Sequence, residues 1–271
     1  MRYENLTRFN DEEFKRLVGV PRPLFSKMMT TLENSERAKK KSGRPHSLTL
    51  EDQLLLSLNY LRSYRTQLEL SVDYGIAESN VNRTIQKVEN ALIQSRYFAL
   101  PKRNQHVAND DFVIIDVTES QIERPKETQR KFYSGKKKKH TLKTQVIFSP
   151  KLNQIVSIQV EIGTMHDLKI ARKYAKEFAN FTCILGDLAY KGFKEIKSKL
   201  LIPIKKPRKM SLPKEAKQIN KEISRRRIPI EHINSRLKVF RILSERYRNR
   251  RKRFGLRVNL ISGLINWMIK K

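Results

Sequence analysis

Two acidic residues in a strongly basic chain have the types and surroundings needed to bind a metal ion. Asp116 lies within the apolar, β-branched run "FVIIDVTES", and Asp187 follows a second apolar run in "TCILGD". Neighbouring strands lie about 4.8 Å apart, so carboxylates at their ends can converge, and they repel each other unless a cation lies between them. Ligation by oxygen atoms alone favours Mg²⁺ or Mn²⁺ over zinc.

Glu231 is the candidate for a third ligand. It is a lone acid between "SRRR" and a basic helical segment, and we expect Pro229 to open this helix as its first residue. The apolar stripe predicted for the helix runs one step away from Glu231, along Ile230, Ile233, Leu237 and Phe240. Glu119, shortly after Asp116, is an alternative member of the set. Each acid also has an ordinary interpretation as a cap, a turn residue or a favourable charge in a first helical turn.

The composition predicts a polyanionic partner. The chain has 271 residues, with 58 lysines and arginines against 27 aspartates and glutamates, for a formal net charge of +31. Nucleic acid is the leading candidate, because neutralised phosphates release condensed counterions. A membrane surface would require a basic amphipathic anchor, a lipidation motif or an apolar span, and we find none in the sequence. The single cysteine, Cys183, excludes an intramolecular disulfide, and the five scattered histidines form no zinc motif.

Residues 1–100 have helical patterns and contain a predicted helix-turn-helix. A basic segment at 37–47, with Gly43 and Pro45, is expected to be an exposed linker. In 66–93, one helix ends at Gly75 and a second begins near Ser79 after a short turn. Four polar residues of this second helix are suited to phosphates and base edges: Asn80, Asn82, Arg83 and Lys87. A plain helical hairpin is the alternative.

Residues 108–271 change to a pattern of strands followed by alternating strands and helices. "DFVIIDVTESQIERP" predicts one strand, and "HTLKTQVIFSPKLNQIVSIQVEIG" predicts two strands joined at a turn. "TCILGD" predicts a short buried strand, and "IPIKKPRKM" another with a basic loop. Helices are predicted at "DLKIARKYAKEF", from "PKEAKQINKEISRR" onward, and at the C-terminus. This order favours the α/β class, with a mixed sheet flanked by helices.

Further residues are weaker candidates for supporting roles. Tyr190 is expected to shape the turn behind Asp187, with packing favoured over a contact to DNA. His166 and Asp167 lie at a predicted strand–helix boundary and are candidates to support the acids, with a helix N-cap at Asp167 as the plain alternative. Candidate contacts to the DNA backbone are the basic runs "KKPRK", "GKKKKH" with Lys137 and Lys138, and "RYRNRRKR" with Arg250 and Arg251. Such contacts give affinity and salt dependence rather than sequence choice.

The acids and their flanking residues resemble a known family. The order Asp116, Asp187, Glu231 is similar to the DDE set of bacterial insertion-sequence transposases, specifically the IS-five family. "GDLAYKGF" resembles that family's motif around the second aspartate, and the stretch from Arg227 to Lys238 resembles its signature around the glutamate. Ser224 stands where that signature often has a tyrosine. "RYRNRRKRFGLRVNLISGLIN" is similar to the family's C-terminal end.

This resemblance implies a fold and an activity. Residues 108–271 are expected to form a ribonuclease-H-like catalytic domain, preceded by the helix-turn-helix domain of 1–100. The three acids would hold two Mg²⁺ ions, which Mn²⁺ can replace, with Arg227 and Lys238 near DNA phosphates. The protein would bind terminal inverted repeats and target double-stranded DNA, then cut and join strands. A homodimer or larger complex on DNA, in the bacterial cytoplasm and associated with the nucleoid, is also expected.

Three alternatives remain at this stage. One is an inactive or domesticated relative that only binds DNA, and the intact acid set argues against it. Another is a nuclease of the same fold that cleaves without strand transfer. A ribosomal or RNA-binding protein would explain the charge, but would not need three acids in this order.

Overall fold

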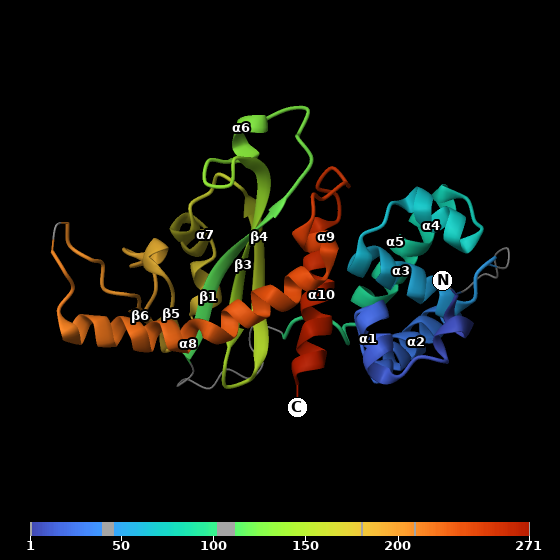
Figure 1. The fold of residues 1–271 in the computed structure, drawn as a ribbon, viewed down its shortest axis with the longest axis horizontal. Helices are drawn as coiled ribbons and strands as arrows, with labels where there is room; N and C mark the ends of the chain where they lie inside the picture. The colour runs from blue at the N-terminus through green and yellow to red at the C-terminus, as the bar shows by residue number, and fades with distance from the viewer. Residues whose placement is uncertain (1, 40–45, 102–111, 180, 209, 271) are drawn as a thin grey trace. The chain divides into compact units, whose positions relative to one another are not determined.

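The computed structural model describes residues 2–39, 46–101, 112–179, 181–208 and 210–270 (Figure 1). These residues form two compact units. The helical unit consists of Met1–Ala99, Leu237–Glu245 and Leu256–Lys271, and the sheet unit consists of Leu100–Arg236 and Arg246–Gly255. The units therefore interleave along the sequence. The assignment of DNA recognition to residues 1–100 and of catalysis to residues 108–271 stays a prediction about function.

The helical unit is built on capped, amphipathic helices. Asn10 and Glu13 form a reciprocal capping box at the start of α1, and the Thr49 side chain accepts a hydrogen bond from the backbone of Asp52 at the start of α3. Its elements are η1 (Tyr3–Leu6), α1 (Asp11–Val18), α2 (Arg22–Arg37), α3 (Leu50–Ser63), α4 (Gln67–Tyr74), α5 (Glu78–Gln94), α9 (Arg241–Ser244) and α10 (Phe254–Ile269).

Helices α4 and α5 form the predicted helix-turn-helix. Gly75 ends α4 with a φ of +62°, a left-handed conformation that glycine adopts without a Cβ clash, and α5 begins at Glu78. The buried face of α5 includes Val81, Ile85, Val88 and Leu92. The polar face of α5 is therefore left for other contacts.

Helix α10 is a core element of the helical unit. The Arg257 Nε donates to the Glu89 Oε1 of α5 at 2.6 Å, and both side chains are at most 2% exposed. Gly263 lies so close to the Phe98 carbonyl that a Cβ added there would be 1.7 Å from its oxygen. The C-terminal helix thus packs tightly against the residues that follow α5.

The sheet unit contains a mixed sheet of order β4-β3-β1-β5-β6. β1 pairs antiparallel with β3, and β3 pairs antiparallel with β4, whereas β1, β5 and β6 are parallel. The elements are β1 (Phe112–Gln121), α6 (Gln129–Phe132), β2 (Tyr133–Ser134), β3 (Lys139–Ser149), β4 (Gln154–Ile162), α7 (Asp167–Lys173), η2 (Ala175–Phe178), β5 (Cys183–Leu185), η3 (Leu188–Tyr190), β6 (Lys199–Leu201) and α8 (Lys214–Val239). The strand pair predicted around "SPKLNQ" is β3 and β4.

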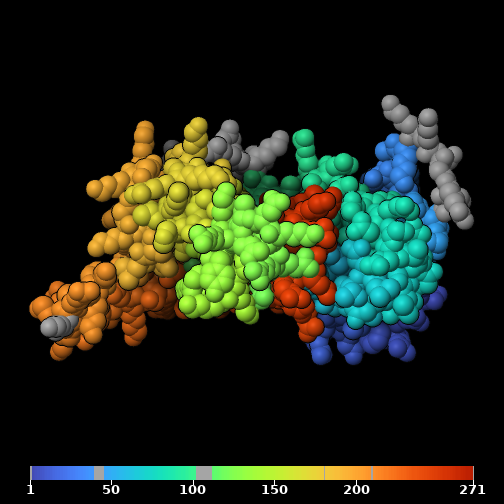
Figure 2. Space-filling model, turned by 90° about the horizontal axis from the view of Figure 1, so that it is seen from above, coloured from blue at the N-terminus to red at the C-terminus, as the bar shows by residue number. Residues whose placement is uncertain are grey.

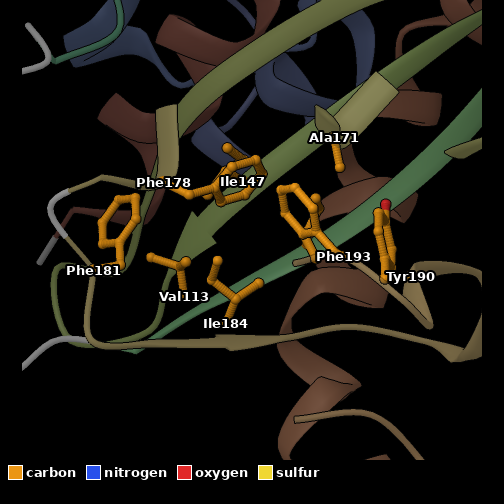
Figure 3. Close-up of a cluster of buried hydrophobic side chains, with 9 residues drawn as sticks. Val113, Ile147, Ala171, Phe178, Phe181, Ile184, Tyr190 and Phe193 are labelled. Atoms are coloured by element: carbon orange, nitrogen blue, oxygen red, sulfur yellow. The ribbon is translucent and has the colours of Figure 1, made fainter. Parts of the chain in front are cut away.

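One face of the sheet packs on an apolar cluster (Figure 3). The strands contribute Val113, Ile147 and Ile184, and the segments around α7, η2 and η3 contribute aromatic and small side chains. These are Ala171, Phe178, Phe181, Tyr190 and Phe193. Side chains alternate along a strand, so Asp116 comes from the face of β1 opposite to Val113 and Ile115. Helix α8 crosses the strands on that opposite face (Figure 1).

Two sequence predictions about this unit are wrong. Pro229 does not open a helix: it lies inside α8, which is continuous because residues on both sides, Ile223 and Ile230, are anchored by burial. Loss of one backbone hydrogen bond at proline is tolerated in this long helix. Glu231 therefore does not lie in a first helical turn. The second wrong prediction is the strand at "IPIKKPRKM". The strand that forms, β6, lies just before this segment, because Lys199–Leu201 are the residues that pair in parallel with β5.

The start of α8 extends away from the sheet. Figures 1 and 2 show the first turns of this helix and the preceding segment, in orange, projecting from the body of the sheet unit. Among residues 214–222 only Ala216 is buried, whereas Ile219 is 49% exposed. The half of α8 after Ile223 is the part that packs on the sheet.

Candidate functional site

The register of β1 and β5 brings Asp116 and Asp187 together. Ile114 pairs with Leu185 across these parallel strands, and each aspartate follows its member of the pair by two residues. The Asp187 Oδ1 accepts a hydrogen bond from the Ala189 backbone at 2.9 Å, which caps η3. The convergence that the sequence predicted for these two acids is therefore present.

Burial and neighbouring charges of both signs act on the pKa of the Asp116 carboxyl. Burial raises the pKa of the Asp116 carboxyl above its ordinary value, and the negative charges of Asp187 and Asp167 raise it further. The nearby Arg227 guanidinium acts in the opposite direction. Asp116 is thus held with two other carboxylates and one cation in a partly desolvated position.

Helix α8 holds the Asp116 carboxylate from the other side. The Asn234 Nδ2 donates to the Asp116 Oδ2 at 2.7 Å, and the Arg227 Nη2 lies 3.5 Å from the Asp116 Oδ1. Both side chains come from the sheet-facing side of α8. Sequence reasoning missed Asn234, because nothing in a single sequence pairs it with a residue 118 positions earlier.

Glu231 lies on α8, four residues after Arg227 and three residues before Asn234. Residues three and four apart are neighbours on a helix surface, so Glu231 is next to both of them. Its side chain is exposed and makes no hydrogen bond or ion pair with another described residue. In the part of the chain that the structure describes, no three histidine, cysteine, aspartate or glutamate side chains are grouped to hold a metal ion. The structure brings Asp116 and Asp187 together, and Glu231 remains a predicted third ligand.

Asp167 is neutralised by a lysine that the sequence analysis did not single out. The Lys143 Nζ on β3 donates to the Asp167 Oδ1 and to the Met165 carbonyl, both at 2.8 Å. His166 occupies the N-cap position of α7, and Asp167 is the first helical residue, so the alternative of an N-cap at Asp167 is wrong. No local signal marks Lys143, because its neighbours in the strand, Thr144 and Gln145, are polar as well.

Tyr190 packs in the apolar cluster behind the acids, as predicted, and is 1% exposed. Its hydroxyl is buried without a hydrogen-bond partner among the described residues. Burial raises the pKa of this hydroxyl well above its ordinary value, and the charges of Asp167, Asp116 and Asp187 add to the effect. Figure 3 shows the ring, with its oxygen, at the edge of the cluster.

The four polar candidates on α5 fall into two groups. Asn80 and Arg83 are exposed, and the Arg83 Nη1 donates to the Asn80 Oδ1 at 3.0 Å. Both line a cavity of about 700 Å³ beside the helix. Asn82 is half-buried and bonds to Gln67 and Gln86.

Lys87 is engaged within the helical unit. Its Nζ lies 2.6 Å from the Glu36 Oε1 and donates to the Gln53 Oε1 at 2.8 Å. Burial lowers the pKa of Lys87, although the Glu36 carboxylate opposes the shift. Lys87 also lines the cavity, but because its ammonium group is engaged, Asn80 and Arg83 are the exposed α5 candidates.

The remaining basic candidates lie on exposed turns and helix ends. Lys137 and Lys138 occupy the turn between β2 and β3, and Lys238 is exposed near the end of α8. Arg250 is exposed, and Arg251 is half-buried against the ring of Phe132. In the run "KKPRK", residue 209 lies outside the described residues, and the other basic residues are exposed.

This geometry defines a class of protein. One carboxylate in the middle of β1 and one just after the adjacent parallel strand β5, on a sheet of order β4-β3-β1-β5-β6 with a long helix across it, are typical of ribonuclease-H-like phosphoryl-transfer enzymes. The helix-turn-helix in the helical unit adds a means of binding DNA.

Comparison with known proteins identifies the family. Residues 115–266 match the family model described as DDE superfamily endonuclease, and residues 46–98 match the model described as helix-turn-helix of DDE superfamily endonuclease. The chain belongs to the DDE superfamily endonuclease family. The family implies dependence on a divalent metal, whereas the narrower IS-five assignment stays a prediction.

Two relatives are named as transposases. The chain is 43% identical over 270 residues, 98% of both chains, to "Probable transposase for insertion sequence element IS702" from Microchaete diplosiphon. It is 27% identical over 224 residues, 82% of this chain and 81% of the other, to "Putative transposase for insertion sequence element IS112" from Streptomyces albus G. Among the residues described above, no helix has the length and apolar character needed to cross a membrane.

Proposed function

We propose that this protein is a transposase that binds the terminal inverted repeats of an insertion sequence and catalyses cleavage and strand transfer of its DNA. The observation that carries the proposal is the juxtaposition of Asp116 and Asp187 on the parallel strands β1 and β5. Glu231, on the helix that contacts Asp116, is the third acid of the set. The near full-length similarity to a transposase of IS702 supports the same activity.

The residues around Asp116 fit a divalent cation. The donors are carboxylate oxygens, which Mg²⁺ and Mn²⁺ prefer. The buried Asn234 Oδ1 also has no partner among the described residues, although the Nδ2 of the same side chain donates to Asp116, and this oxygen can accept a hydrogen bond from a water in the hydration shell of an ion. Asp116, Asp187 and Glu231 would hold two Mg²⁺ ions. When bound, these ions supply Lewis-acid stabilisation of charge at phosphorus and activation of a water or a 3′-hydroxyl.

The chain's own residues orient the catalytic carboxylates and the substrate. Asn234 and Arg227 fix the rotamer of Asp116, and the Ala189 backbone fixes that of Asp187. Tyr190 would shape the turn behind Asp187 from within the apolar cluster, and His166 and Asp167, at the start of α7, would support the acids. Arg227 and Lys238 would neutralise phosphates near the scissile bond.

DNA recognition is proposed to use the polar face of α5. Asn80 and Arg83 would reach base edges, whereas Asn82 and Lys87 would maintain the position of the helix. Lys137, Lys138, Arg250 and Arg251 would contact the backbone of the repeats and the target. Two protomers would bridge two DNA ends, in a bacterial cytoplasm and associated with the nucleoid.

A cleavage and joining assay tests the proposed function. The purified protein is incubated with duplex DNA carrying the ends of its own element and a target plasmid, with Mg²⁺, with Mn²⁺ or with EDTA. We expect metal-dependent cleavage at the element ends and joined products. Cleavage without joining would favour the nuclease alternative. Specific binding to the ends without cleavage in either metal would favour an inactive relative.

Replacing Asn234 tests the role of α8 in positioning Asp116. Asn234→Ala removes the hydrogen bond to the Asp116 Oδ2, and we expect cleavage to slow by about 10- to 100-fold, as for other residues that orient metal ligands. The Mg²⁺ concentration for half-maximal activity is expected to rise, which a purely structural role would not cause. Ser235→Ala, at an exposed neighbouring position of the same helix, is the matched control. An Asn234→Ala protein with the parent's rate and metal dependence would contradict this role.

A further inference from the structure

A second cationic site lies in the sheet unit, away from the acids. The loop after β1, residues 123–128, and the loop before α10 line a cavity of about 510 Å³. Five of the lining residues are basic and two are acidic: Arg124, Lys126, Arg246, Arg250 and Arg251, with Glu123 and Glu127. The first loop is exposed, in bright green, on the face shown in Figure 2.

The positive charges of this cavity are not neutralised internally. No ion pair links Glu123 or Glu127 to the basic residues of the cavity within the described ranges. The Arg124 Nε donates to the Gln129 Oε1 at 2.8 Å, and the Arg251 guanidinium lies 4.5 Å from the centre of the Phe132 ring. These contacts fix the two guanidinium groups, yet supply no negative charge. The cavity therefore presents an excess of oriented donors to solvent.

The second loop is firmly built onto the end of β1. Tyr247 forms a parallel bridge with Ile122, its backbone donates to the Gln121 carbonyl at 2.9 Å, and its side chain is fully buried. The Tyr247 hydroxyl donates to the Lys252 carbonyl at 2.5 Å, which closes the loop. The cavity is thus a fixed feature of the sheet unit.

The backbone of the second loop is strained at three arginines. Arg250, Arg251 and Arg253 have φ values of +46°, +67° and +60°, in the left-handed region that non-glycine residues seldom adopt. Such strain is concentrated at ligand-binding sites, where the direction of a side chain matters more than local stability. Glycine or asparagine would relieve this strain, so the presence of arginine points to a use for its guanidinium group.

We propose that this cavity binds backbone phosphates of the DNA substrate, at a fixed distance from the cleavage site. The proposal rests on the proposed function, because it places the cavity relative to Asp116. Ile122, beside the cavity, follows Asp116 by six positions along extended chain, or about 20 Å at 3.3 Å per residue. For a duplex that runs parallel to β1, this corresponds to about six base pairs at 3.4 Å per base pair. Guanidinium forks match phosphate oxygens in two-point contacts, so arginine is the residue suited to this position.

Equilibrium binding in EDTA tests the proposal without catalysis. Arg246→Gln with Arg250→Gln removes two exposed guanidinium groups, and Lys176→Gln with Lys197→Gln is a control of equal charge at exposed positions of the same unit. We expect the arginine variant to bind a 40-base-pair duplex about tenfold more weakly than the control. The slope of log K against log salt concentration should also be about 2 units smaller in magnitude for the arginine variant than for the control. This difference should be the same on the element ends and on unrelated sequences.

Shorter duplexes test the distance. When the duplex is trimmed to fewer than about six base pairs on one side of the cleavage site, the arginine variant and the control should bind equally. The proposal would be overturned if the arginine variant and the control had equal salt slopes on the long duplex. It would also be overturned if their difference in affinity persisted whichever side of the duplex was trimmed. If the parent protein does not distinguish the element ends from unrelated DNA, the proposed function fails, and the salt slopes still decide whether the cavity binds phosphate.

Arg250→Gly separates binding from folding. Glycine accepts the left-handed conformation at this position, so the variant should unfold at the same temperature as the parent or higher. Its slope of log K against log salt concentration should nevertheless be about 1 unit smaller in magnitude than that of the parent. A variant that keeps the parent's DNA affinity and slope would show that Arg250 has no ligand.

Discussion

Asp187→Asn is expected to lower metal-dependent DNA cleavage by about 1,000-fold or more while DNA binding is retained. A metal ion at the reacting phosphorus contributes several kcal/mol of charge stabilisation, and each 1.4 kcal/mol is a factor of ten in rate. The substitution removes the negative charge at almost constant shape. The asparagine oxygen can still accept the hydrogen bond from the Ala189 backbone, so the local turn should persist. Single-turnover cleavage of end-labelled DNA, with binding measured in parallel, provides the test.

Glu119→Gln is the matched comparison for this prediction. Glu119 is the other acid near Asp116 in sequence, and its carboxylate accepts a hydrogen bond from the Thr141 Oγ1 at 3.0 Å, which the amide oxygen of glutamine can replace. We expect this variant to cleave at nearly the parent's rate. The opposite result, in which Glu119→Gln is inactive and Asp187→Asn is active, would show that the acid set has been misassigned. Glu231→Gln, if it behaves as Asp187→Asn does, would identify the third ligand.

The sequence was sufficient to predict the acid pair because the signal is local. Asp116 and Asp187 each end an apolar, β-branched run, and runs of this kind form the central strands of a buried sheet. Once β1 and β5 are neighbours, the register fixes the distance between the two carboxylates. The helix-turn-helix was predictable for the same reason, since Gly75 and the apolar face of α5 are both local features.

The parts that could not be predicted depend on contacts between distant segments. Asn234 meets Asp116 only because α8 crosses the sheet, and α8 crosses it as one helix because tertiary packing overrides the break expected at Pro229. Lys143 pairs with Asp167 across β3 and α7, which no short motif encodes. The return of the C-terminal helix to the helical unit is also invisible in the local pattern.

Because the C-terminal helix is part of the helical unit, we expect replacement of Arg257 to lower the stability of this unit strongly. The Arg257–Glu89 pair joins α10 to α5, and the Arg257 guanidinium also lies 5.2 Å from the centre of the Tyr60 ring of α3. Arg257→Met removes the buried guanidinium from this pair with Glu89, and breaking a buried pair by removing one member costs about 3–5 kcal/mol. We therefore expect a loss of this size in the free energy of unfolding of the helical unit. Trp267, the one tryptophan of the chain, lies on α10 and reports this unfolding by its fluorescence in a urea titration.

Two further variants decide whether charge is the cause. Glu89→Leu combined with Arg257→Met replaces the pair with apolar side chains, and it should recover much of the loss, because the cost arises from removing one member of a buried ion pair. Arg226→Met disrupts an exposed pair with Glu222 and should have a small effect. If the double variant is as unstable as Arg257→Met alone, packing of the arginine against Tyr60, rather than charge, holds the C-terminal helix against α5. Asn80 and Arg83 lie on α5, the helix that the Arg257–Glu89 pair supports. In either case, Arg257→Met should therefore weaken DNA binding only under conditions in which the fluorescence of Trp267 reports unfolding.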